Sequence, residues 1–270
     1  MSNLNWRKHL IPREHGAWAM WIVPFIIGMF ASGGFTIQAL QVFLSTLLVF
    51  FARSALGSAV RLRERDKSTA AKCLVIAAIE LLAAILCVIS IVLEINISFI
   101  VVSGLAGLIL LADLFWVRDR MERNLGIELI GVAGFVITGP AVYLANTGQW
   151  QVTAIWLWLF SFVYFAGSVF YVKLRLARTA VKGKIMENEQ KYARLIIAYT
   201  LVISVILIVM AGITNIAGWF LLGYIPWFLY LLINGFKPAK NLNRIGWVLI
   251  VHSLYFTTVL SMFFVLSSGQ

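Results

Sequence analysis

The sequence predicts an all-α integral membrane protein with nine transmembrane helices, and three observations support this prediction. The 270 residues are 61% hydrophobic and only 12% charged, which is unlike a soluble domain with a polar surface. Apolar runs long enough to cross a hydrocarbon core of about 30 Å recur along the whole chain. These runs are continuous and lack the alternating pattern of a membrane β-barrel. We therefore expect one polytopic membrane domain over residues 1–270.

The nine helices are placed where apolar runs lie between polar breaks, since roughly 20 helical residues cross the hydrocarbon core. The predicted spans are 16–33, 37–60, 72–93, 97–116, 127–146, 152–173, 194–212, 216–235 and 246–267. The first span follows basic residues but lacks the A-x-A-like end of a cleaved signal peptide. It is therefore predicted to be a retained helix.

The basic residues predict which way the helices face. All 22 Lys and Arg residues fall before the first span, near the end of the second, or after the second, fourth, sixth and eighth. By the positive-inside rule that side is cytoplasmic, with the N-terminus inside and the C-terminus outside. The net charge of +11 therefore belongs to one membrane face, and no nucleic-acid partner is expected. The predicted location is the cytoplasmic membrane of a prokaryotic cell.

A short internal repeat suggests two related halves of four helices, plus one further helix. VRLR begins at Val60 after the second span, and VKLR begins at Val172 after the sixth. A shift of two residues instead aligns Ser54 with Ser168 and Arg61 with Arg175, so two registers remain open. Parallel repeats of this kind commonly place a site between the halves.

Hydroxyl and arginine side chains share one face of the second span and one face of the sixth. The first stripe consists of Ser54, Ser58, Arg61 and Arg65, and the second of Tyr164, Ser168, Tyr171, Arg175 and Arg178. Lys173, in the same basic segment, is a further candidate anion ligand. Guanidinium groups bind phosphate oxygens in bidentate fashion, which favours an anion site here. The alternative is a basic collar that contacts lipid headgroups and fixes the topology.

Several ionisable residues lie deeper than a collar would require. Arg53 and Glu80 each lie about 12 Å inside the membrane from the nearest flanking basic residue, where charges usually face a cavity or a partner. We expect them to line the site or to pair with each other. Asp113 and Glu128 are expected either to be neutralised by Arg118, Arg120 or Arg123, or to act in catalysis. His252 is expected to be a hydrogen-bonded interior residue.

The N-terminal block PREHGAWAM, Pro12 to Met20, resembles the opening signature of the YwiC-like membrane protein family. The segments Met121 to Glu128 and GSVFYVKLRLAR, Gly167 to Arg178, resemble that family as well. The resemblance implies no particular activity. Within the block, Glu14 and His15 are candidates for proton transfer, or else they cap the first helix.

A looser similarity is to the UbiA superfamily of intramembrane prenyltransferases, whose fold it implies. Those proteins carry Asp-rich motifs after the second and sixth helices, which bind Mg²⁺ and a prenyl diphosphate. Here the first place has only Glu64 and Asp66, and the second has Lys173, Arg175 and Arg178. Without paired carboxylates to hold Mg²⁺, no cofactor is predicted.

Two functions are therefore carried forward. The first is binding of a phosphate-bearing isoprenoid or other anionic lipid, with a non-standard prenyl or lipid transfer as the reaction. Its predicted anion ligands are Arg53, Arg61, Arg65, Lys173, Arg175 and Arg178, and its pocket hydroxyls are Ser54, Ser58, Ser168 and Tyr171. Its catalytic candidates are His15, Glu14, Glu80 and Asp113. The second function is non-enzymatic: a lipid or anion transporter, or an accessory subunit of a membrane complex.

Overall fold

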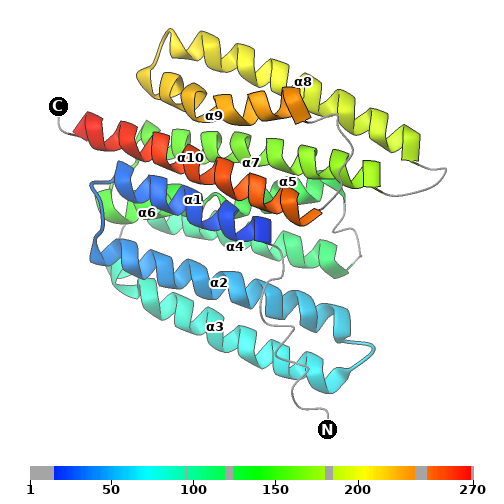
Figure 1. Ribbon diagram of the computed structural model, residues 1–270. Helices are drawn as coiled ribbons and strands as arrows, with labels where there is room; N and C mark the ends of the chain where they lie inside the picture. The colour runs from blue at the N-terminus through cyan, green and yellow to red at the C-terminus, as the bar shows by residue number, and fades with distance from the viewer. Residues whose placement is uncertain (1–14, 95–96, 119–123, 180–184, 235–241, 269–270) are drawn as a thin grey trace. The chain divides into compact units, whose positions relative to one another are not determined.

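The computed structural model describes residues 15–94, 97–118, 124–179, 185–234 and 242–268, and within these ranges the chain is helical and forms no strand (Figure 1). The helices are α1 (His15–Ala31), α2 (Ile37–Leu62), α3 (Lys67–Leu93), α4 (Ile97–Arg118), α5 (Leu125–Phe135), α6 (Thr138–Thr147), α7 (Val152–Thr179), α8 (Ile185–Ala211), α9 (Asn215–Asn234) and α10 (Leu242–Ser268). Among the described residues, seven helical spans are long and apolar enough to cross a membrane, and two shorter apolar helices accompany them. The prediction of a multi-pass, all-α membrane protein is confirmed.

Several helices run further at their basic ends than the apolar pattern predicted. Helix α7 continues to Thr179 rather than 173, and α8 begins at Ile185 rather than 194. Helix α3 begins at Lys67 rather than 72. Hydropathy marks only the part of a helix that lies in hydrocarbon, whereas the helix itself continues through polar residues beyond it.

The fifth predicted span is not one continuous helix, because it breaks at Val136 and Ile137 between α5 and α6. Pro140 lies in the first turn of α6 and has no N–H to donate to Val136. The Thr138 hydroxyl donates to the carbonyl oxygens of Phe135, at 3.1 Å, and of Trp21, at 2.9 Å. The break is fully buried, so its backbone is satisfied by protein rather than exposed to lipid.

The chain divides into two compact units, residues 1–158 and 159–270, with the boundary inside α7. The first unit holds α1 to α6 and the first residues of α7, and the second holds the rest of α7 with α8 to α10. The predictions of a single domain and of two four-helix repeats stay predictions.

In the first unit, α2 packs against α3, α4 and α6, while α1 packs mainly against α6. Helices α2 and α3 form an antiparallel hairpin (Figure 1), and small residues line the contact between them, with Ala52, Ala55 and Ala77 completely buried. Asp66 caps α3 by accepting a hydrogen bond from the Thr69 backbone at 3.0 Å. Hydrogen bonds from Thr69 hold the pKa of the Asp66 carboxyl below its usual value.

A polar clasp joins the α1–α2 connection to the end of α6, away from the basic residues. The Asn146 amide donates to the Ser32 hydroxyl at 2.7 Å and accepts from the Thr36 hydroxyl at 2.6 Å. The connection turns at Gly33 and Gly34, whose φ angles of 98° and 106° favour glycine. These hydrogen bonds therefore hold the α1–α2 connection against the end of α6.

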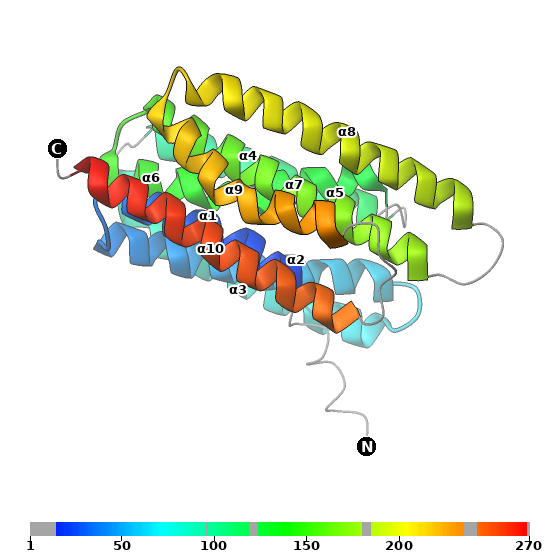
Figure 2. The ribbon, with the colours of Figure 1, turned by 45° about the horizontal axis from the view of Figure 1, so that its top comes forward.

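In the second unit, α9 packs against both α8 and α10, and α8 and α9 form a hairpin (Figure 2). Aromatic rings attach α7 to this set. Tyr164 stacks on Phe256 of α10 at 4.0 Å between centroids, and Phe160 stacks on Phe220 of α9 at 4.3 Å. The Tyr199 hydroxyl of α8 donates to the Val163 carbonyl of α7. These contacts fix the middle of α7 relative to α8, α9 and α10.

Candidate functional site

An ion pair joins α2 and α4 in the interior of the first unit. Arg53 Nη2 donates to Asp113 Oδ1 at 3.0 Å, and Arg53 Nε lies 2.9 Å from Asp113 Oδ2. One hydrogen bond and one close ion contact thus join the guanidinium to the carboxylate. Asp113 is only 8% exposed, and both residues lie within spans long enough to cross a membrane. The pair is therefore an intramembrane charge pair, which is costly and seldom accidental.

A cluster of aromatic rings from α1, α2 and α5 packs beside Arg53. The guanidinium carbon of Arg53 lies 5.3 Å from the centroid of the Phe135 ring, within the range of a cation–π contact. Phe135 is the last residue of α5 before the break and packs edge-on against Phe50. Phe50 in turn packs against Trp18 and Trp21 of α1. Phe135 thus connects this aromatic cluster both to the ion pair and to the helix break.

The sequence singled out both Arg53 and Asp113 but did not predict that they pair with each other. Asp113 was expected to be neutralised by Arg118, Arg120 or Arg123, and Arg53 was expected to line a site or to pair with Glu80. The structure pairs Arg53 with Asp113. The physical reason is orientation, because depth alone does not say which helix faces meet. Glu80 instead leaves Oε2 buried with no hydrogen-bond partner among the described residues.

The basic residues that follow α2 lie at the surface of the first unit. Arg65 is exposed in the turn after α2, and Arg61 is exposed in the last turn of that helix. The Arg61 guanidinium folds back along α2, with one nitrogen 3.5 Å from where a Cβ on Gly57 would lie. Within the first unit these two side chains match the collar interpretation as well as the anion-site interpretation.

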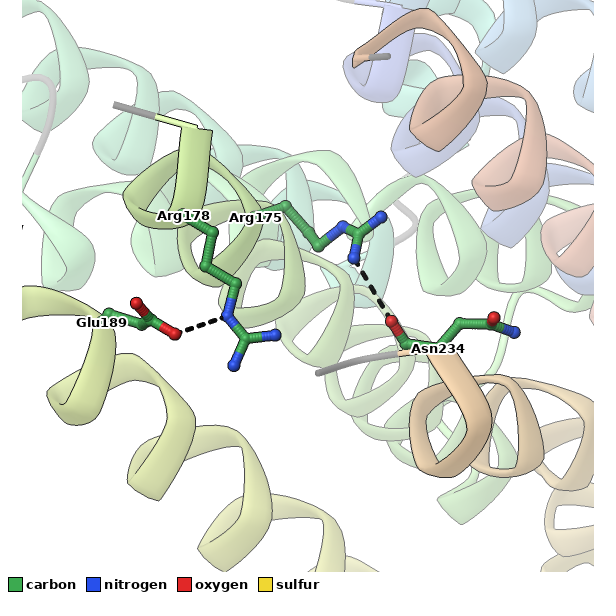
Figure 3. A network of polar contacts seen from close by, with 4 residues as sticks. All are labelled: Arg175, Arg178, Glu189 and Asn234. Atoms are coloured by element: carbon green, nitrogen blue, oxygen red, sulfur yellow. Dashed lines mark hydrogen bonds and ion pairs between the residues drawn. The ribbon is translucent and has the colours of Figure 1, made fainter. Parts of the chain in front are cut away.

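At the basic end of the second unit, Arg175 is buried although its charge is on a helix end (Figure 3). Its Nη1 donates to the backbone carbonyl of Asn234, the last residue of α9, at 3.2 Å. Its guanidinium carbon lies 5.5 Å from the centroid of the Tyr171 ring, one turn earlier on α7. The unsatisfied carbonyls at a helix C-terminus are natural partners for a cation. Arg175 is therefore held in one orientation by α7 and α9.

Arg178 joins α7 to α8 close by (Figure 3). Its Nε donates to Glu189 Oε1 at 2.8 Å, and the Arg178 side chain is only 12% exposed. The sequence proposed Arg178 as an anion ligand and gave it no carboxylate partner. In the structure Glu189 provides one, which reduces the positive potential that Arg178 contributes.

Aromatic side chains with polar groups continue from Arg175 into the second unit. The Tyr171 hydroxyl donates to the Tyr230 hydroxyl at 3.2 Å, and the Trp227 ring packs edge-on against Tyr171. The His252 ring of α10 lies 5.3 Å from the Tyr230 ring, centroid to centroid. His252 is therefore packed among aromatic rings, in line with its predicted interior role. Sequence reasoning did not identify Trp227 or Tyr230, because nothing in the pattern places α9 beside α7.

The predicted pocket hydroxyls have contacts of their own. The Ser168 hydroxyl donates to the Phe165 carbonyl at 2.7 Å within α7, and Ser58 is buried in α2. Ser54 and Lys173 are half-buried and also have contacts within the protein. Gly167, which opens the GSVFYVK segment, is a packing position, because a Cβ there would lie 3.1 Å from the Tyr199 ring. Helix packing thus accounts for the glycine at the start of this segment.

Two catalytic candidates, Glu14 and His15, fall partly or wholly outside this geometry. Glu14 lies outside the described residues, and His15 is described only as the first residue of α1. In the part of the chain that the structure describes, no three His, Cys, Asp or Glu side chains come close enough to hold a metal. The two aligned arginines of the internal repeat differ in environment, because Arg61 is exposed and Arg175 is buried.

The sequence is similar to one described protein family and to one protein of known sequence. Residues 11–143 match the sequence model of a family described as "YwiC-like protein". The chain is 28% identical to "Uncharacterized protein YwiC" from Bacillus subtilis (strain 168) over 262 residues, which cover 95% of this chain and 98% of that protein. No solved structure matches the chain significantly. The family match includes Arg53, Asp113 and Phe135, and the full-length similarity extends to the second unit.

Proposed function

This chain is similar to the YwiC-like protein family, and from this similarity and the geometry of α7 we propose that it is a member of that family and that it binds an anionic lipid. The ligand is a phosphate-bearing isoprenoid or a lipid of similar chemistry. Its headgroup lies at the basic end of the helices, and Arg175 is the residue that contacts the phosphate. The likeness to the UbiA superfamily remains part of this proposal.

The buried and oriented guanidinium of Arg175 is the single observation that carries the proposal. Arg175 Nη1 donates to the Asn234 carbonyl, and its Nε is a buried donor that makes no hydrogen bond to the described residues. Tyr171 and Asn234 hold the group in place, so little side-chain entropy is lost when a phosphate binds. A basic residue that only contacts lipid headgroups is expected to be exposed at the surface. Arg175 is only 8% exposed, which favours a specific binding role.

The surroundings of Arg175 suit a ligand with a charged head and an apolar tail. Lys173 and Arg178 lie on the same two turns of α7 and add positive charge, which Glu189 offsets only in part. Leu176 of α7 and Leu229 and Ile233 of α9 are large apolar side chains exposed at this end of the second unit. An isoprenoid chain lying along them would bury apolar area at roughly 25 cal/mol per Å².

The positive-inside rule supports placing this end at the cytoplasmic face of the cell membrane. The N-terminus then lies inside and the C-terminus outside. A transfer reaction on the bound lipid would differ from Mg²⁺-dependent prenyl transfer, because the described residues here supply guanidinium and ammonium groups in place of paired carboxylates. Arg61 and Arg65 remain candidate ligands at the basic end of the first unit.

Lipids that co-purify with the protein test the proposal. We expect mass spectrometry to find a phosphate-bearing lipid with the wild type, and about ten-fold less of it with Arg175→Ala, because a hydrogen bond to a charged group contributes about 1.5–3 kcal/mol. Arg63→Ala is the matched control, since Arg63 is exposed and lies in the turn after α2. It should retain the wild-type lipid profile.

The folding of each variant must be checked in the same preparation, because Arg175 also joins α7 to α9. Arg175→Lys keeps the charge but not the bidentate geometry, and it should give an intermediate lipid content. An unchanged lipid profile in a folded Arg175→Ala protein would reject this site and favour an accessory role in a membrane complex.

A further inference from the structure

Glu80 lies on the face of α3 whose buried residues are small or apolar. The buried positions of α3 recur at spacings of three, four and seven residues, which places them on one face against α2: Ala70, Cys73, Ala77, Ala84 and Ile91. Glu80 comes three residues after Ala77 and four before Ala84, so it belongs to this face. A carboxyl therefore takes a position where the pattern calls for a small residue.

The pairing of α2 with α3 sets the level of Glu80. Near one end of the hairpin, the Gln41 amide donates to the Ser90 hydroxyl at 2.8 Å. Further along, Ala52 and Ala55 pack against Ala77. Because the helices are antiparallel, Glu80 lies near the level of Ala52, one residue before Arg53. Glu80 thus shares its depth in the membrane with the ion pair of Arg53 and Asp113.

The charged groups available to Glu80 are few. The helices packed against α3 are α2, which carries Arg53 and Arg61, and α4, which carries Asp113 and Arg118. Arg53 pairs with Asp113, and Arg61 and Arg118 lie at the basic ends of their helices. At this level, α2, α3 and α4 thus carry one guanidinium group and two carboxyl groups.

Ionisation of the Glu80 carboxyl would be energetically unfavourable at this position. Its Oε2 is buried and accepts no hydrogen bond from the described residues, and a carboxylate in hydrocarbon without donors is strongly unfavourable. Adding a proton removes the charge and the second negative group at this level. We propose that Glu80 is a proton-binding site in the membrane-spanning part of the first unit, and that its carboxyl is protonated at neutral pH.

This site is independent of the lipid site at Arg175, which lies in the second unit. It gives the first unit a group that takes up or releases one proton inside the hydrocarbon.

A carbodiimide tests the protonation state directly. Dicyclohexylcarbodiimide dissolves in the hydrocarbon and reacts with a protonated carboxyl: the carboxyl oxygen bonds to the carbodiimide carbon and the proton passes to its nitrogen. The O-acylisourea then rearranges by oxygen-to-nitrogen acyl transfer to a stable N-acylurea, and nothing leaves. Glu80 is reachable from lipid, because Ile79 and Leu82 beside it are about 60% exposed.

We expect membranes treated at pH 7 to carry the label on the peptide that contains Glu80. Labelling of Glu80 should exceed that of Glu94 about a hundred-fold, because an ordinary exposed glutamate is almost wholly ionised at pH 7. Asp113, which is paired with Arg53, should stay unlabelled. Glu80→Gln should remove the label, Glu94→Gln should not, and a water-soluble carbodiimide should not reach Glu80.

Infrared spectroscopy gives a second readout that does not depend on reagent access. A protonated carboxylic acid has its own C=O band, which the wild type should show and Glu80→Gln should lose. Glu80→Gln is a neutral mimic of the protonated acid and should fold normally. The proposal is overturned if Glu80 is labelled no more than Glu94, or if Glu80→Gln retains the full band.

Discussion

Replacing Asp113 with leucine is expected to destabilise the first unit by about 3–5 kcal/mol, because removing one partner of a buried pair leaves the other charge uncompensated. Arg53 would keep its guanidinium in the interior, beside the Phe135 ring and without a carboxylate partner among the described residues. Arg53→Leu should be comparably harmful, since it leaves Asp113 buried at 8% exposure. Replacing both residues by leucine removes the two charges together and should recover most of the loss.

Cys73 provides a convenient measurement of this loss. The chain has two cysteines, and Cys73 is completely buried in the contact between α2 and α3. Once the half-buried Cys87 is replaced by alanine in all variants, a thiol-reactive fluorogenic maleimide reports when this hairpin opens on heating. The Asp113→Leu midpoint should fall by on the order of 10 °C, while Glu94→Gln serves as a surface control. If the two single losses simply add in the double variant, the ion pair contributes no coupling and the account of this site is wrong.

Gly28→Ala is expected to disrupt the contact between α1 and α6, although it adds only one methyl group. A Cβ at Gly28 would lie 2.3 Å from the Gly139 carbonyl oxygen and 2.8 Å from Val142 Cγ1. The nearest atom is backbone, so no side-chain rotation relieves the clash and the helices must separate. Overpacking of this kind costs about 1–3 kcal/mol and occasionally more, and here it displaces the helix whose first turn bonds to the Trp21 carbonyl.

Gly104→Ala is the matched control, because α4 offers open space at that position with nothing within 4 Å of the added Cβ. It should be neutral or raise the stability by up to about 1 kcal/mol, since alanine is the better helix former. Both variants are compared by thermal unfolding and by yield of folded protein from membranes. Equal tolerance of the two substitutions would show that α1 and α6 do not approach as closely as described.

The helices were predictable because long apolar runs have few alternatives in a membrane. Their basic ends were less predictable, since polar residues from Ile185 onward continue α8 without any apolar signal. The break at Val136 and Ile137 is marked in the sequence only by Gly139 and Pro140, which the strong hydropathy of the segment concealed. Periodicity and composition thus locate segments better than they locate interruptions within them.

For the candidate sites, the sequence located unusual residues but did not predict which residues on other helices they contact. Depth in the membrane correctly identified Arg53 and Glu80 as unusual, but the choice of Asp113 as the partner of Arg53 depends on how α2 and α4 face each other. The arginine stripe on α7 was visible as a stripe. Its contacts with the Asn234 carbonyl and Glu189 come from other helices, and no local pattern encodes them.

Photolabelling with a diazirine-bearing isoprenoid monophosphate tests lipid binding at Arg175 most directly. In membranes that contain the wild-type protein, the probe should label peptides from the last turns of α7 or from the C-terminal half of α9, and unlabelled farnesyl phosphate should compete. Inorganic phosphate should compete weakly, because it lacks the apolar tail. Arg175→Ala should lose most of the competed label, and Arg63→Ala should keep it. Labelling that farnesyl phosphate does not reduce, or that persists unchanged in a folded Arg175→Ala protein, would contradict the account.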